Sequence, residues 1–145
     1  MNREIKFRGY NYQYKKWFYG SLFIQNYDND FMLSSSRTMI IDDKGYSVMV
    51  DKGTIGEYTG LKDKNGVEIY EGDVCKGNKF SDENELFVIK YGKYKTKDWK
   101  EKYISNTYQY GWFAEFIKTK EQVHLVTPNG IEVIGNIYEY ENEEE

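Results

Sequence analysis

The feature that most constrains the fold is a block of strand-forming residues wrapped around a polar turn. It runs from Thr54 to Val74 with the sequence TIGEYTGLKDKNGVEIYEGDV, and Asp63–Gly66 lies at its centre. Asp at the first turn position accepts bonds from its own backbone, and Gly at the fourth supplies positive φ. The block therefore predicts a hairpin that pairs residues 58–61 with residues 67–70, followed by a second turn at 71–73.

Composition extends this expectation to the whole chain. The 145 residues include 15 Tyr, 8 Phe, 3 Trp and 13 Gly, whereas alanine occurs once, at Ala114. Aromatic side chains pack well on pleated surfaces, and the residues that favour helices are scarce. We expect a mainly β, antiparallel fold with little helix and a barrel-like form, SH3-like or similar.

Alternating apolar residues and turn signals place the other strands. A first hairpin is expected around the loop 11–16 and a second around the turn 42–45, and residues 25–36 are interpreted as a polar connection. Further strands are expected over residues 86–91, 111–117, 123–126 and 131–138. Between them, residues 93–110 follow neither the two-residue period of a strand nor the 3.6-residue period of a helix. A short helix over 98–104 is one interpretation.

The predicted organisation has three parts. Residues 1–53 form an N-terminal β extension, residues 54–139 the main barrel-like domain, and residues 140–145 an acidic tail. The net charge of −4 and a pI near 5.2 indicate no overall basic field. No apolar stretch has the length of a membrane helix or the form of a signal peptide, so a cytoplasmic location and no membrane partner are expected.

Reactive groups are few. A single Cys75 and a single His124 cannot supply the ligand set of a zinc site, and no phosphate-binding loop is present. Cys75 is expected to be a small buried residue, and His124 a structural or exposed strand residue. The sequence therefore predicts no catalytic residue, no metal ligand and no cofactor.

One acidic group keeps an enzymatic alternative open. Glu68, Glu71 and Asp73 lie close together in the sequence, and paired carboxylates can bind a hard cation or transfer protons. A metal-dependent hydrolase is the least favoured function. A solvated hairpin edge is the preferred interpretation of these acids.

The segment with a plausible binding mechanism is 90–103, KYGKYKTKDWKEKY, in which lysines alternate with aromatic residues. Lysines neutralise phosphates and aromatic faces stack on unpaired bases, so the segment could bind single-stranded nucleic acid. A solvated lysine-rich excursion has the same composition, and the absence of arginine argues against readout of base sequence. The candidate binding residues are Lys93, Lys95, Lys97, Trp99, Lys100 and Tyr103.

Three motifs together resemble a known family. They are the hairpin block at 54–74, the later EVIGNIYE, and the opening REIKFRGYNYQYKKW. In combination they closely resemble the YopX proteins of phages and prophages. Cys75 stands where that family more usually has an aliphatic residue, and residues 25–52 and the lysine-rich segment follow no pattern of the family.

The resemblance implies a β-rich fold and a phage origin, and it carries no catalytic or ligand residue. The leading hypothesis is a non-enzymatic binding or accessory module inside a bacterial host cell, with a protein partner. Exposed strands and abundant tyrosine are typical of interfaces. A nucleic-acid partner and self-association are the alternatives that the sequence leaves open.

Overall fold

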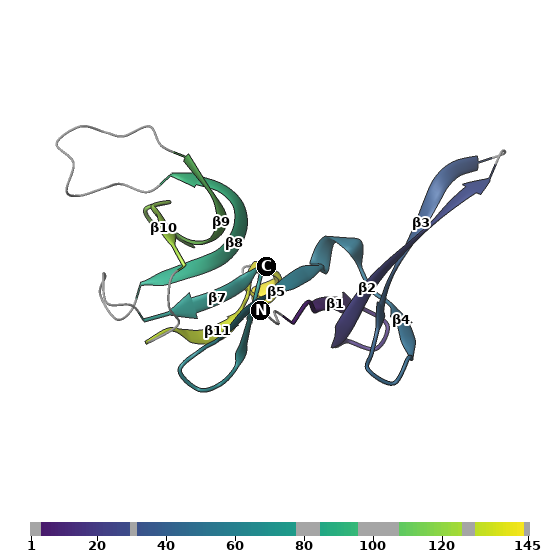
Figure 1. Ribbon diagram of the computed structural model, residues 1–145, viewed down its shortest axis with the longest axis horizontal. Helices are drawn as coiled ribbons and strands as arrows, with labels where there is room; N and C mark the ends of the chain where they lie inside the picture. Colours follow the sequence, from purple (N-terminus) through teal and green to yellow (C-terminus); the bar gives the residue numbers. More distant parts are fainter. Residues whose placement is uncertain (1–3, 30–31, 78–84, 96–107, 126–129, 144–145) are drawn as a thin grey trace. The chain divides into compact units, whose positions relative to one another are not determined.

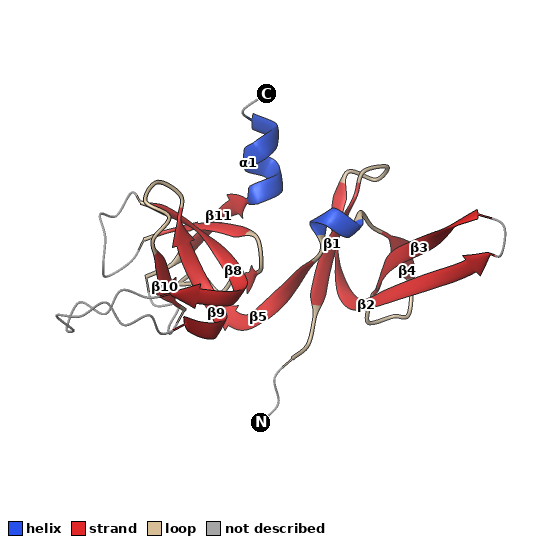
Figure 2. Ribbon diagram, turned by 90° about the horizontal axis from the view of Figure 1, so that it is seen from above, coloured by secondary structure: helices blue, strands red, loops and turns tan. Residues whose placement is uncertain are grey.

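A computed structural model describes residues 4–29, 32–77, 85–95, 108–125 and 130–143, and the statements below concern these residues. They form mainly β-strands, with one 3-10 helix and one α-helix (Figures 1 and 2). The elements in chain order are β1 (Phe7–Asn11), β2 (Lys16–Asn29), β3 (Met32–Ile41), β4 (Ser47–Met49), η1 (Lys52–Thr54), β5 (Gly56–Lys62), β6 (Glu68–Tyr70), β7 (Asp73–Lys76), β8 (Leu86–Lys95), β9 (Tyr108–Phe116), β10 (Gln122–His124), β11 (Glu132–Asn136) and α1 (Ile137–Glu143).

The described strands form two antiparallel sheets. The hydrogen-bonded order is β4-β3-β2-β1-β5-β6 in one sheet and β10-β9-β8-β7-β11 in the other. β10 and β11 are the edge strands of the second sheet, and the described strands form no closed barrel. The predicted antiparallel, mainly β character with little helix is confirmed, whereas the barrel-like form is not, because these strands form two open sheets.

Contacts divide the chain into two compact units, Met1–Tyr58 and Thr59–Glu145, and each is described by itself. The domain division at residues 53 and 54 stays a prediction. Within the described residues no helix is long and apolar enough to cross a membrane, since α1 has only seven residues.

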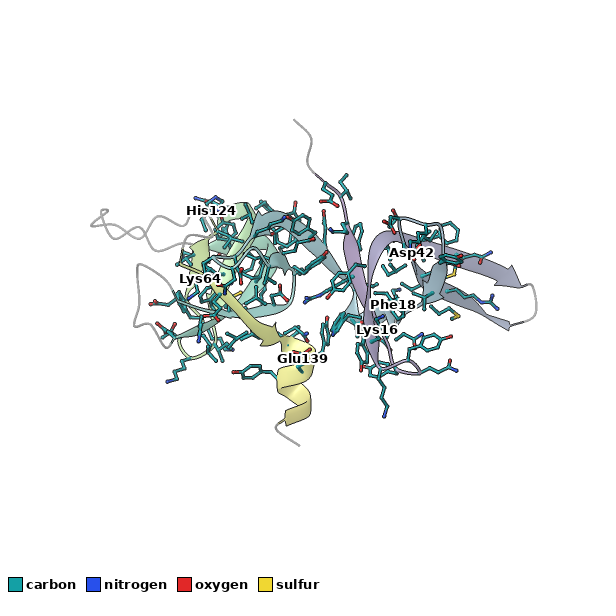
Figure 3. The ribbon with its side chains drawn as sticks, turned by 90° about the horizontal axis from the view of Figure 1, so that it is seen from below. Lys16, Phe18, Asp42, Lys64, His124 and Glu139 are labelled. Carbon is teal, nitrogen blue, oxygen red and sulfur yellow. The ribbon has the colours of Figure 1, made fainter. Side chains whose placement is uncertain are left out.

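In the first unit both predicted hairpins are present. The β1–β2 turn is closed by Asn11, whose Oδ1 accepts the N–H of Tyr14 at 2.8 Å. The β3–β4 turn is closed by Asp42, whose Oδ1 accepts two backbone N–H groups at 2.9 and 3.0 Å. At the start of β2 the ammonium group of Lys16 lies 5.7 Å from the ring centre of Phe18; Figure 3 labels both.

The polar connection expected over residues 25–36 is wrong. β2 and β3 form a long antiparallel ladder that includes residues 25–29 and 32–36, with Gln25 opposite Arg37 and Asn26 opposite Ser36. These directly paired residues are all polar. No apolar face alternates with a polar one there, so the period-2 signal of a half-buried strand is missing.

In the second unit the signature hairpin forms as predicted, and its turn also holds a distant strand. Asp63 Oδ1 accepts the N–H groups of Asn65 and Val67, at 2.8 and 2.9 Å. Asp63 Oδ2 accepts the N–H of Val133 in β11 at 3.0 Å, across 70 residues of sequence. Gly66 has the positive φ of 80° that the turn requires.

These bonds change the acidity of the turn aspartate. Burial alone would raise the pKa of Asp63, but the backbone N–H groups of Val133, Val67 and Asn65 and the charge of Lys64 outweigh burial. The pKa of Asp63 is therefore lowered. The carboxylate is ionised in the folded protein and fastens the hairpin to β11.

The core of the second unit lies between β6, β7, β8, β9 and the segment before β11. Its buried members are Ile69, Cys75, Phe87, Ile89, Ala114, Phe116, Leu125 and Ile131. Cys75 has no exposed surface, so its predicted role as a small buried residue is confirmed. The core thus includes the N-terminal part of β8 and the C-terminal part of β9.

The strand expected over residues 131–138 ends early. β11 stops at Asn136, whose Oδ1 accepts the N–H groups of Tyr138 and Glu139, both at 3.1 Å. An Asn in this position caps a helix, and α1 follows through residues 140–143 of the predicted acidic tail. The N–H of Ile137 also donates to the carbonyl of Gly72 at 2.9 Å, which ties α1 to the signature block.

Candidate binding face on strands β8 and β9

The structure describes only part of the predicted binding segment. Lys93 and Lys95 lie near the C-terminal end of β8. The other four candidates, Lys97, Trp99, Lys100 and Tyr103, and the helix expected over 98–104 lie outside the described residues.

β9 brings a second row of aromatic residues to the described lysines. The strands pair without a register shift, and cross-strand partners share one face of a sheet. The pairs on this face are Tyr91 with Trp112, Lys93 with Tyr110, and Lys95 with Tyr108. We call these six residues the aromatic–lysine face.

Most rings of this face are open to solvent. Tyr110 is 75% exposed, and Tyr91 and Tyr108 are also exposed. The ammonium group of Lys93 lies 4.2 Å from the ring centre of Tyr108, in cation–π contact. The face thus presents aromatic surface and positive charge side by side.

Trp112 joins the face to the core. Its ring packs edge to face against Tyr91, with centres 4.9 Å apart, and also against the buried core cluster. Its indole N–H is buried and has no hydrogen-bond partner among the described residues. Trp112 therefore fixes the inner end of the face.

A bend in the sheet makes this face convex. Phe113 is opposite Lys90, and Tyr94 lies four residues further along β8, which is about 13 Å away in a straight strand. The rings of Tyr94 and Phe113 nevertheless stack with centres 5.0 Å apart, so the ladder curls toward their side. Figure 1 shows the curvature of β8 and β9. Because the ladder curls toward the rings of Tyr94 and Phe113, the aromatic–lysine face, on the opposite side of the strands, is on the outer side of the bend.

Two paired glycines permit the bend. Gly92 and Gly111 are direct partners with φ of 141° and 148°, a region that side-chain-bearing residues rarely adopt. A Cβ on either glycine would meet no atom within 4 Å. Backbone conformation, rather than space, requires glycine here.

The concave side is held by a buried tyrosine. The hydroxyl of Tyr94 bonds Gln109 Oε1 at 2.8 Å and is in hydrogen-bond contact with His124 Nδ1. Tyr94 is 1% exposed, and burial raises its pKa. Figure 3 labels His124, which lies exposed at the end of β10, as expected of an exposed strand residue. Tyr94 therefore links β8, β9 and β10 beneath the face.

Lys90 and Glu115, further along the concave side, form an ion pair with each other. Lys90 Nζ donates to Glu115 Oε1 at 2.7 Å, and Gln122 Nε2 donates to Glu115 Oε2 at 3.0 Å. Burial would raise the pKa of Glu115, but the bonds from Lys90 and Gln122 outweigh it, so the pKa is lowered. Lys93 and Lys95 lie on the other side of these strands, on the convex face.

The acidic alternative gains no support from the geometry. Asp73 is 1% exposed, and its Oδ2 accepts the N–H of Tyr70 at 2.8 Å. Glu68 Oε2 accepts the hydroxyl of Tyr70 at 3.0 Å. Among the described residues, no three His, Cys, Asp or Glu side chains are grouped so as to hold a metal ion.

Sequence reasoning missed the β9 half of the face. Tyr108, Tyr110 and Trp112 were not among the candidate residues, although they alternate with Gln109 and Gly111. That alternation is the available signal, because it places three rings on one side of a strand. Their position beside Lys93 depends on strand pairing, which the sequence does not show.

Comparison with known proteins gives a family and a structural likeness. The chain has a 22% identical counterpart of known structure in protein EF1440 from Enterococcus faecalis, with 99% of this chain and 100% of that chain covered and a TM-score of 0.47. Curated proteins include no match. The family model of the YopX protein matches residues 6–142, which is nearly the whole length. The chain belongs to the YopX family.

Proposed function

We propose that this YopX chain is a non-enzymatic binding module whose aromatic–lysine face is the contact surface. The observation that carries the proposal is the convergence of exposed rings and lysines on one convex side of β8 and β9. Aromatic side chains supply large contact area with little loss of conformational freedom. The family resemblance supports a role inside a bacterial host cell.

The scaffold beneath the face supports a binding role. Trp112 is packed on the core, Tyr94 ties three strands together on the concave side, and the glycine pair sets the bend. Rigid elements position a binding surface better than loops, because less freedom is lost on association. The described face is thus organised before any ligand arrives.

Site-specific photocrosslinking tests this proposal. We would replace Tyr110 by p-benzoylphenylalanine, express the chain in bacteria, irradiate, and compare it with the same replacement at Tyr46. Tyr46 is a matched control, since it is 73% exposed against 75% for Tyr110 but belongs to the first unit. The proposal expects a crosslinked adduct from Tyr110 in excess of the control.

Digestion of the adduct with protease or nuclease then gives the class of the partner. Equal yields at Tyr110 and Tyr46 would contradict the proposal. So would a hydrolytic activity of the purified chain that is lost when Glu68 and Glu71 are replaced by alanine.

A protein partner bound through the first unit is the second candidate. Phe23, Met39 and Met49 are direct neighbours across β2, β3 and β4, so they form one apolar row, and Phe23 and Met49 are exposed. Aromatic residues and methionine are enriched at protein interfaces. A photocrosslinker at Phe23 should capture a protein, and the added substitution Met49→Lys should abolish capture.

A further inference from the structure

We propose that the ligand of the aromatic–lysine face is a single-stranded nucleic acid, an inference that rests on the proposed function. Four independent properties of the described face support this ligand class: its charge, the spacing of its rings, its lack of arginine, and the position of its lysine.

Charge on the face is opposite to that of the chain. Between Tyr91 and Lys95 in β8, and between Tyr108 and Trp112 in β9, the described residues include two lysines on the convex face and no carboxylate. The chain as a whole carries −4. A local positive surface on an acidic protein attracts a polyanion, and binding releases the counterions that surround it.

The spacing of the rings selects unpaired bases. Tyr108, Tyr110 and Trp112 are alternate residues of β9, so their Cα atoms lie about 6.6–6.8 Å apart. That distance equals about two stacked layers of about 3.4 Å each, one protein ring and one base. The convex bend widens these gaps at the ring tips, so each gap has at least the width that one base needs. Bases of a single strand can enter such a row, whereas bases of a duplex are held against their own neighbours.

Readout of a duplex needs groups that the described face lacks. Bidentate donors such as arginine read base edges in the major groove, and within the described strands β8 and β9 no arginine is present. Aromatic stacking accepts every base because every base has a π face. The face should therefore bind single strands with weak sequence preference.

The position of Lys93 argues against a protein ligand here. Lys93 lies among the rings, opposite Tyr110 and in contact with Tyr108, rather than at a rim. Lysine is depleted at the centre of protein interfaces, where its desolvation is costly. The same lysine suits a phosphate, which needs a point charge near the stacked base.

Fluorescence anisotropy with labelled oligothymidylate and oligouridylate of about 15 nucleotides tests the inference on the full chain. Both strands should bind more tightly than a duplex of equal length, with affinity falling as salt rises from about 50 to about 200 mM. Comparing the two strands shows whether DNA or RNA is preferred.

Three variants locate the contact. Tyr110→Ala should weaken binding about 5- to 150-fold, as expected for the loss of one stacked base. Lys93→Gln should reduce the slope of log affinity against log salt by about 0.7. Tyr46→Ala, the matched exposed tyrosine, should bind as the wild type does. Thermal melting of each variant checks that the fold is kept.

The outcomes separate this inference from the proposed function. If neither strand binds at low salt while Tyr110 still crosslinks to a protein, the nucleic-acid inference is overturned and the binding module stands. Binding of duplex as tight as that of single strands overturns the inference as well. If single strands bind the Tyr110→Ala and Lys93→Gln variants as tightly as the wild type, this face is not their contact surface and the nucleic-acid inference falls. Equal crosslinking at Tyr110 and Tyr46 would overturn the binding module as well.

Discussion

The signature hairpin and the aromatic–lysine face belong to the same unit, yet their side chains are used in opposite ways. In the hairpin the polar groups are buried and bonded: Asp63 holds three backbone N–H groups, and Thr59 Oγ1 donates to the carbonyl of Ile69 at 2.8 Å. On the face, the rings of Tyr91 and Tyr110 are exposed. The polar groups of the hairpin bond within the hairpin and to β11, whereas the rings of the face are accessible to a ligand.

The residues by which the family is recognised therefore differ from the residues proposed to bind a ligand. The residues that identify the family, around Asp63, Gly72 and Asn136, bond to one another and to β11 and α1. Substitutions there should change stability. Substitutions of the exposed tyrosines of the aromatic–lysine face should change binding and leave stability nearly unchanged, because those side chains are largely in solvent.

The largest effect is expected from Asp63→Ala. The substitution removes the buried carboxylate that accepts the N–H groups of Asn65, Val67 and Val133, and should lower the free energy of unfolding by about 3 kcal/mol. Urea denaturation followed by circular dichroism measures the loss.

Asp42→Ala is the matched control for this substitution. Asp42 closes the β3–β4 turn with two similar bonds, but those bonds are exposed, so water replaces the lost acceptor and the cost should stay below about 1 kcal/mol. Equal losses for the two variants would contradict the view that burial makes the signature turn special.

A glycine substitution on the bend should have the next largest effect. Gly111→Ala introduces a Cβ with no neighbour within 4 Å, so sterics predict no cost, but φ of 148° strains any side-chain-bearing residue. We expect a loss of about 1–3 kcal/mol in the free energy of unfolding. Gly45→Ala, at φ of 85° in an open turn, is the control for a position without a bend. A neutral Gly111→Ala would show that the curvature does not depend on this glycine pair.

Acid should weaken the hairpin in a way that identifies Asp63. Its pKa is lowered on folding, so its charge contributes stability that is fully present above the unfolded pKa of 3.8 and is lost as pH falls through the lower folded value. The stability difference between the wild type and Asp63→Asn should therefore be constant near neutral pH and shrink below about pH 4. Urea denaturation over this range measures it. A difference independent of pH would exclude an ionised Asp63 as its source.

Local chemistry explains how much of the fold could be predicted. The signature hairpin was predicted because Asp63 and Gly66 encode their turn within four residues. The β2–β3 ladder was missed because Gln25 faces Arg37 and both are polar, which removes the alternation that marks a half-buried strand. Helix α1 was missed, although Asn136 and Glu139 have the spacing of a capping box.

The candidate site was half predicted for a related reason. Lys93 and Lys95 were found from composition, since lysines and rings alternate along one segment. Tyr108 and Tyr110 reach them only through pairing of β8 with β9 across a long connection, and such non-local contacts leave no mark on either segment. The bend at Gly92 could not be predicted either, because glycine in a strand is compatible with turns, bulges and bends.

The smallest effect on stability is expected where the effect on binding is large. Tyr110→Ala removes a side chain that is 75% exposed, so the free energy of unfolding should change by less than about 0.5 kcal/mol. Its neighbour Trp112→Ala, which packs on the core, should instead cost about 3 kcal/mol. Urea denaturation of both variants measures the contrast. A Tyr110→Ala variant as unstable as Trp112→Ala would mean that the ring of Tyr110 supports the fold, and the face would then be scaffold like the hairpin.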